Sequence, residues 1–267
     1  MSEKHTVRPR HAKMGFNATW SMAVGGMVGG GIFSVLGVVI MIAGQWAWLS
    51  FLLAGLIALA TAYSYSQLAR DFGESGGAFT FLRHINHEGF AGSLAWVLIL
   101  GYILTISVYG YTFGHYIAHS LSRGAWVPRF SALAIIAVLT WVNLRGVSDS
   151  SLVEIVTVWG KLAVLLGLAA FGLAKWAPAE LSAGIAPKGW SAALVGGASV
   201  FMAYEGFQLL TYDYDDIRDA DRTLPLASMS AVIAVICIYI LVALGATMLV
   251  GAGTLVQQEE VALAEAG

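Results

Sequence analysis

The sequence predicts an all-α membrane protein in which about seven helices cross a bilayer. Hydrophobic residues make up 58% of the 267 residues and charged residues only 11%, whereas a soluble domain carries about 25% charged residues. The charged residues are also clustered, and long apolar runs separate the clusters. Because apolar and polar residues do not alternate with a period of two, a membrane β-barrel is disfavoured.

A membrane-spanning helix needs about 20 mostly apolar residues to cross roughly 30 Å of hydrocarbon. Seven stretches are candidates, at about 16–43, 45–69, 89–118, 130–144, 151–174, 191–211 and 225–251. The fourth is shorter than the rule requires. The first apolar run is too long for the core of a signal peptide, so we expect it to be retained as a span.

The distribution of Lys and Arg predicts which side each loop faces, because cytoplasmic loops carry an excess of both residues. With the N-terminus in the cytoplasm, nine lie inside, namely Lys4, Arg8, Arg10, Lys13, Arg70, Arg83, Arg145, Arg218 and Arg222, and four outside, namely Arg123, Arg129, Lys175 and Lys188. An odd number of spans then places the C-terminus outside. The expected organisation is a cytoplasmic segment over 1–13, a transmembrane domain over 14–252 and an extracytoplasmic tail over 253–267.

The first span contains the stretch AVGGMVGGGIF, residues 23–33, with glycines at positions 25, 26, 29, 30 and 31. One interpretation is close helix packing, which small residues on one face allow. These glycines spread beyond one face, however, and consecutive glycines favour an unwound backbone. Unwound backbone at membrane depth is tolerated only where it is buried in protein or lines a cavity. There its N–H groups and the positive end of the following half-helix can bind a carboxylate.

A second break is expected in the sixth span, because discontinuous helices occur in pairs at the substrate sites of secondary transporters. The stretch VFMAYEGFQLLTYDYDD, residues 200–216, places Glu205 and Gly206 after an uninterrupted apolar run. A charged residue at membrane depth costs at least about 2.5 kcal/mol and indicates function. Glu205 is then a proton carrier or the partner of a substrate cation. The alternatives are a buried acid that is hydrogen-bonded for packing, or a residue near the end of the span.

Lys161, in VTVWGKLAVLL, lies ten residues after Ser151 in the fifth span, a depth of roughly 15 Å at the rise of a helix. It is therefore near the middle of the membrane. Burial lowers the pKa of a lysine, which suits the residue to reversible protonation. The alternative is a structural lysine that pairs with Glu154, seven residues earlier on the same face.

Other chemistries find no support in the sequence. It contains no cluster with metal-ligand spacing, no phosphate-binding loop beside a strand and no nucleophile motif, so we predict neither an enzyme nor a metal or cofactor site. The net charge of −2 provides no basic face for nucleic acid. Cys237 is the single cysteine, which excludes an intramolecular disulfide.

Four motifs occur in order along the chain, and together with the spans they carry a family resemblance. They are GGMVGGGIF at 25–33, FGESGGAFTFLRH at 72–84, NLRGVSDSS at 143–151 and FMAYEGFQLLTYDYDDIRDADRTLP at 201–225. From about residue 14 to its end, the chain resembles the amino acid–polyamine–organocation (APC) superfamily of amino acid permeases. The resemblance implies two inverted repeats of five helices, with helices 1 and 6 broken.

The resemblance also implies a site for an amino acid or related amine between the two breaks. The amides of Gly30 and Gly31 would hold the carboxylate, and the backbone around Met27 and 202–205 would hold the amine. The implied substrate-binding residues are Met27, Gly29, Gly30, Gly31, Met202, Ala203, Tyr204, Glu205 and Gly206. Lys161 matches a fifth-helix lysine that replaces a sodium ion in proton-coupled members, and Glu205 is the second candidate for proton coupling.

The chain departs from the family pattern at particular positions. Met202 stands where an aromatic lid is common, and Glu205 replaces a residue that is often apolar. The largest departure is length, because the family has at least ten helices and this chain has seven. We therefore expect a fragment of a permease of a prokaryotic inner membrane, or a chain that needs a partner. The alternative is a truncated, non-transporting scaffold or receptor-like seven-helix protein, and an ion channel would need a ring-forming filter that the sequence does not supply.

Overall fold

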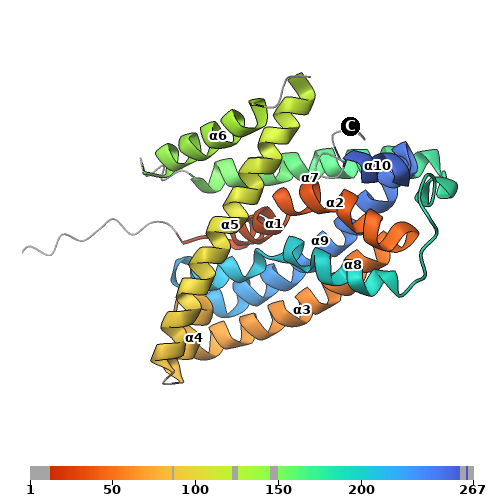
Figure 1. Cartoon of the computed structure of the whole chain (residues 1–267). Helices are drawn as coiled ribbons and strands as arrows, with labels where there is room; N and C mark the ends of the chain where they lie inside the picture. The colour runs from red at the N-terminus through yellow and green to blue at the C-terminus, as the bar shows by residue number, and fades with distance from the viewer. Residues whose placement is uncertain (1–12, 86, 122–125, 145–149, 259–262, 264–267) are drawn as a thin grey trace, which may run out of the picture.

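A computed structural model describes residues 13–85, 87–121, 126–144, 150–258 and 263. Within these ranges the chain is helical, and one isolated bridge joins Met14 to Ile217. In chain order the α-helices are α1 (Phe16–Met27), α2 (Gly30–Ala43), α3 (Ala47–Phe72), α4 (Gly77–His84), α5 (Glu88–Leu121), α6 (Val127–Leu144), α7 (Ser150–Lys175), α8 (Ala192–Val200), α9 (Ala220–Val250) and α10 (Ala252–Gln258). Short 3-10 turns η1 (Gly44–Trp46), η2 (Pro178–Leu181), η3 (Phe201–Tyr204), η4 (Phe207–Thr211) and η5 (Tyr214–Asp216) connect some of them (Figure 1).

The helices coincide with the expected spans, and the two expected breaks are confirmed. The first span consists of α1 and α2, and the sixth consists of α8 followed by η3 and η4. Five stretches of the described chain are long and apolar enough to cross a membrane, namely Gly31–Phe72, Gly89–Leu121, Ile155–Lys175, Ala192–Thr211 and Ala220–Val250. The first of these joins α2 to α3, and the apolar part of α6 is shorter, at Val127–Trp141. The protein is therefore an all-α integral membrane protein.

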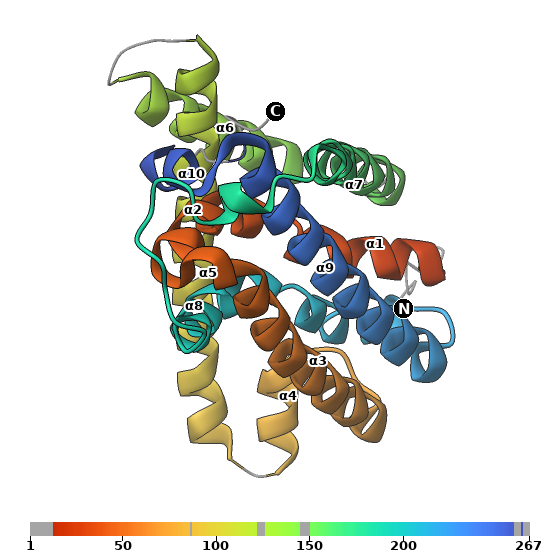
Figure 2. The ribbon, with the colours of Figure 1, turned by 90° about the vertical axis from the view of Figure 1, so that its right-hand side faces the viewer.

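Helix α9 forms the centre of the bundle. It packs against α1, α3 and α7, and Figure 2 shows it running diagonally between them. Small residues allow the closest approach: a Cβ on Gly245 would lie 2.6 Å from the Cα of Ala169 in α7. Without a hydrophobic driving force between helices in lipid, such small-residue contacts provide the packing that holds them together. The α7–α9 contact therefore fixes where the residues of α7 face.

Helices α5 and α6 form a pair at one side of this bundle, and α5 leans obliquely across it (Figure 1). The two approach so closely that a Cβ on Gly114 would clash with the backbone of Pro128. Large apolar side chains on their outer faces are exposed, Trp96 and Phe130 among them. In a bilayer such faces meet lipid tails, so their exposure has no cost there.

Two short helices lie outside the expected spans. Helix α4 lies in the second quoted motif, and α10 lies within the segment that the sequence suggested as a tail. Leu255 of α10 is fully buried against the core, which explains why this segment folds back onto the bundle. Several sequence predictions fall outside the described residues, namely the segment 1–12, Arg123, the middle of the motif NLRGVSDSS and most of 259–267.

Candidate functional site

The first break separates α1 from α2 by two residues. The amide of Val28 still bonds to the Val24 carbonyl, which completes the last turn of α1. Gly29 then leaves helical geometry, with φ −113° and ψ −142°, before α2 begins at Gly30. No side chain of the described residues caps α2, so the N–H groups of its first turn keep the partial positive charge of a helix start. The break therefore presents a helix C-terminus and a helix N-terminus to the same region.

Lys161 binds this break directly. Its ammonium on α7 donates a 2.7 Å hydrogen bond to the carbonyl oxygen of Val28. The carbonyl end of α1 carries partial negative charge, so a cation is stabilised there. The depth estimated from the sequence and the position in the structure agree, because Lys161 reaches the unwound residue that follows α1.

The second break is longer. After η3, Glu205 is extended, with φ −65° and ψ 133°, and Gly206 has φ +147°. Only glycine adopts such a backbone readily, because it lacks a Cβ. The side chain of Gln208 accepts a 2.7 Å hydrogen bond from the Gly206 amide, which satisfies a donor that the break would otherwise leave open. The helix restarts as η4.

The two breaks cross in contact with each other. A Cβ on Gly206 would lie 2.5 Å from the carbonyl carbon of Gly26, and one on Gly31 would lie 2.9 Å from the Cα of Ala203. Glycines at 26, 31 and 206 therefore allow the two backbones to approach. This explains why the glycines spread around the first span, since two faces of that span meet the sixth.

Tyr239 joins the breaks, and the sequence analysis missed it. This fully buried residue of α9 has its hydroxyl 2.7 Å from the carbonyl oxygen of Met27 and 2.9 Å from that of Ala203. A phenol has one proton to donate, so both carbonyls compete for it. No local pattern identified Tyr239, because it is one aromatic residue in an uninterrupted apolar helix.

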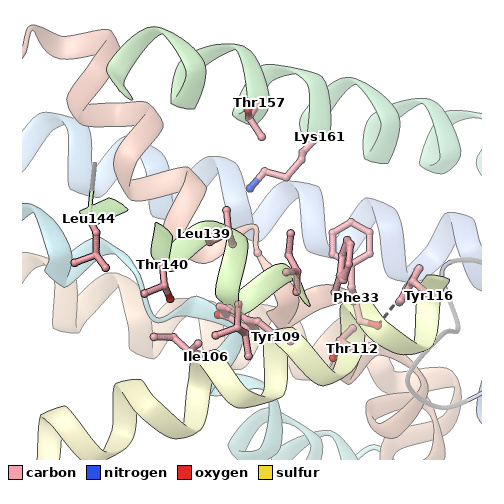
Figure 3. Close-up of a pocket in the computed structure, with 15 residues that line it drawn as sticks. Phe33, Ile106, Tyr109, Thr112, Tyr116, Leu139, Thr140, Leu144, Thr157 and Lys161 are labelled. Atoms are coloured by element: carbon pink, nitrogen blue, oxygen red, sulfur yellow. Dashed lines mark hydrogen bonds between the residues drawn. The ribbon is translucent and has the colours of Figure 1, made fainter. Parts of the chain in front are cut away.

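A cavity of about 920 Å³ opens beside the first break, between α2, α5, α6 and α7. Gly29 and Lys161 line it, and Figure 3 shows Lys161 extending from α7 into the pocket, with Tyr109 and Thr112 of α5 across from α7. Thr112 is 4% exposed, and its hydroxyl finds no hydrogen-bond partner among the described residues. Because a buried polar group costs free energy when it is left unpaired, this hydroxyl is suited to bind a polar group in the cavity.

A second cavity, of about 460 Å³, lies beside the second break, between α3, α5 and the turns η3 and η4. Met202 and Glu205 line it, together with Tyr65 of α3 and Tyr102 of α5. Both Met202 and Glu205 are exposed in the described structure. The only carboxylate of the sixth span therefore faces this smaller cavity.

The residues predicted for one site are thus distributed over three places. Gly29 and Lys161 line the larger cavity, and Met202 and Glu205 line the smaller one. Five others form the buried seam between the breaks, namely Met27, Gly31, Ala203, Tyr204 and Gly206. Gly30 is the first residue of α2. The Tyr204 hydroxyl donates to the carbonyl oxygen of Phe51 at 2.8 Å. The side chain of Glu154, suggested as an alternative partner of Lys161, lies outside the described residues.

Two of the quoted loop motifs meet at one end of the bundle. The amide of Asp215 donates to the Ser75 hydroxyl at 2.9 Å, and the amide of Gly76 donates to the Thr211 carbonyl at 3.1 Å. Burial, and secondly the charge of Asp216, raises the pKa of Asp213 in this loop. The loop after α3 therefore holds the chain that leaves the second break.

The sequence as a whole matches the amino acid permease family over residues 14–266. The chain belongs to this family. Within the described residues, no group of three or more His, Cys, Asp or Glu side chains could hold a metal ion. Among the described residues, the candidate site of this amino acid permease family member consists of backbone, one lysine, one carboxylate and tyrosines.

Individual relatives are 28–30% identical to this family member over the aligned residues. An uncharacterized protein of Methanocaldococcus jannaschii is 30% identical over 92% of this chain and 57% of its own length. An inner membrane transport protein of Escherichia coli is 28% identical over 92% of this chain and 58% of its own length. Cationic amino acid transporter 9, chloroplastic, of Arabidopsis thaliana is 28% identical over 92% of this chain and 46% of its own. The chain therefore spans about half the length of these relatives.

Proposed function

We propose that the protein acts in a secondary active transporter that moves amino acids or related amines by alternating access. The observation that carries this proposal is the hydrogen bond from Lys161 to Val28, because it ties an ionisable group to the broken helix that lines the larger cavity. The names of relatives support the class, since one is an inner membrane transport protein and another a cationic amino acid transporter.

The substrate carboxylate is proposed to bind at the start of α2. The N–H groups of Gly30 and Gly31 belong to an uncapped first turn, and such turns bind anions through both hydrogen bonds and the helix dipole. Gly29 exposes this turn to the larger cavity. The Thr112 hydroxyl, buried in the wall of that cavity, supplies a further hydrogen bond to the substrate.

Transport is proposed to be coupled to protons through Lys161. A protonated Lys161 holds the negative end of α1 by charge and hydrogen bond. The neutral amine loses the charge, so the contact between α7 and the break weakens and the break can move. Proton exchange with water in the larger cavity thereby links the charge of Lys161 to the position of α1. Glu205 is the second group that can carry charge at membrane depth.

The membrane that contains the protein and its orientation there are also proposed. We place the protein in a prokaryotic inner membrane with its N-terminus in the cytoplasm. Since the relatives are about twice as long as the chain, the complete site is proposed to include helices beyond those described, from the same gene or a partner chain. The competing function is a membrane scaffold that binds no amino acid.

A pair of lysine variants tests the coupling. Lys161→Ala in the protein expressed from its complete gene should abolish uptake driven by a pH gradient. Lys175→Ala is the matched control, because Lys175 also donates to a helix carbonyl, that of Leu249 at 2.9 Å, but at the exposed end of α7. Undiminished pH-driven uptake by Lys161→Ala, or an equal loss in both variants, would remove Lys161 from the mechanism.

A further inference from the structure

The two cavities differ in charge. The larger cavity contains the Lys161 ammonium and adjoins the positive start of α2. Of the described residues that line the smaller cavity, Glu205 alone is charged. The first break therefore adjoins a cationic cavity, and the second break adjoins an anionic one.

Aromatic residues surround the carboxylate in the smaller cavity. The rings of Tyr65 and Phe207 meet edge to face at 6.1 Å between centroids, which fixes both side chains. The hydroxyls of Tyr102 and Tyr212 lie 3.5 Å apart and join α5 to the chain after the second break. Aromatic faces attract ammonium and guanidinium groups, and the attraction strengthens when the cation is removed from water. The lining thus combines a carboxylate with aromatic rings, and both groups attract a cation.

Tyr109 lies where the two cavities approach each other. Its ring is 3.7 Å from the position that a Cβ on Gly29 would occupy, and it lines the larger cavity. The preceding residue of α5, Val108, lines the smaller cavity together with Glu205, so α5 contributes to the walls of both cavities. A ligand bound at the first break therefore has Glu205 as its neighbour across Tyr109.

We infer that the smaller cavity binds a second, distal cation of the substrate, an ammonium or guanidinium group, with Glu205 as its counter-ion. This inference rests on the proposed function and specifies its substrate class as amino acids with a basic side chain. The carboxylate of such a substrate lies at the start of α2 and its distal cation beside Glu205. A carboxylate at membrane depth is costly unless it is paired, and a substrate with a basic side chain supplies the partner.

Three ligands separate the contributions of the two ends. L-lysine and L-norleucine share the backbone and the four-carbon side chain and differ by the terminal ammonium, and 1,5-diaminopentane is lysine without its carboxylate. Binding is measured by isothermal titration of the protein expressed from its complete gene. A charge-assisted hydrogen bond corresponds to about a ten- to hundredfold difference in affinity, so lysine should bind at least about tenfold tighter than norleucine.

Charge-neutral variants assign that difference to one residue. Glu205→Gln should lower the affinity for lysine to about that for norleucine, while Glu205→Asp should keep most of the preference. Asp71→Asn, at the exposed end of α3, is the matched control because it removes a carboxylate that lines neither cavity. It should leave all three affinities as they are.

Other binding results would refute the cation site or another part of the proposal. If norleucine binds as tightly as lysine, or if Glu205→Gln weakens both equally, the cation site is wrong while the amino acid carrier stands. If diaminopentane binds and depends on Glu205 but neither amino acid binds, the cation site stands and the carboxylate site at the start of α2 is wrong. If none of the three ligands binds, the cation site is wrong, and uptake of a mixture of labelled amino acids then decides whether the carrier stands.

Discussion

Replacing Tyr239 with phenylalanine tests whether one hydroxyl holds the two broken helices together. The change removes the group that contacts the carbonyl oxygens of Met27 and Ala203 at 2.7 and 2.9 Å and leaves the ring in place. An unpaired buried acceptor costs about 1–3 kcal/mol. Met27 keeps a 2.9 Å bond from the Gly29 amide, so most of the cost falls on Ala203. We expect a loss of about 1–3 kcal/mol in the free energy of unfolding.

The assay is denaturant unfolding in detergent, followed by ligand titration, with Tyr204→Phe as the matched variant. Tyr204 is equally buried and donates one 2.8 Å bond, but to α3 rather than between the breaks. Both variants should lose similar stability. Only Tyr239→Phe should weaken amino acid binding, by about tenfold, which corresponds to about 1.4 kcal/mol. Equal effects on binding, or a stability loss below about 0.5 kcal/mol for Tyr239→Phe, would refute the reasoning.

Three further predictions concern single residues. Thr112→Val should leave the free energy of unfolding within about 0.5 kcal/mol of wild type, because the Thr112 hydroxyl has no hydrogen-bond partner among the described residues. The same variant should lower the affinity for an amino acid about three- to tenfold. Unchanged affinity in a ligand titration would exclude contact between this hydroxyl and the ligand. Gly206→Ala should lower the free energy of unfolding by about 3 kcal/mol or more, because φ is +147° and an added Cβ would clash with the backbone of the first break. Gly160→Ala is the control in the same unfolding assay. It should stabilise the protein by about 0.5–1 kcal/mol, because no atom lies within 4 Å of the added Cβ. Burial, and secondly the hydrogen bond to Asp221, raises the pKa of Tyr214 from 10.0 to about 12. The stability that this shift contributes is present below pH 10 and is lost as the pH rises through 12. Tyr214→Phe should remove this pH dependence of the unfolding free energy, and an unchanged pH profile would contradict the prediction.

The breaks could be predicted from the sequence because their cause is local. Consecutive glycines around Gly29 leave no side chains to stabilise a helix, and a glycine after Glu205 permits the positive φ of Gly206. Lys161 could be placed at the depth of the first break by counting residues along a helix. Each of these inferences depends on one segment and its own periodicity.

The relations between segments could not be predicted in the same way. Tyr239 acts through two carbonyls far away in the chain, and its surroundings in the sequence are those of any lipid-facing or core tyrosine. The separation of Glu205 from Lys161 into two cavities depends on the packing of α5, whose Tyr109 lines one cavity and whose Val108 lines the other. The fold of α10 depends on the pocket that receives Leu255. Tertiary packing decides all three, and a single sequence does not encode it locally.

The most direct test of the account measures amino acid and proton movement together. The protein expressed from its complete gene is reconstituted into liposomes that contain a pH-sensitive dye, and a mixture of labelled amino acids is added outside. We predict saturable uptake of at least one amino acid, with acidification of the interior that disappears in Lys161→Ala. Saturable uptake without proton movement would contradict the role of Lys161, and the absence of any saturable uptake or binding would contradict the proposed transport function itself.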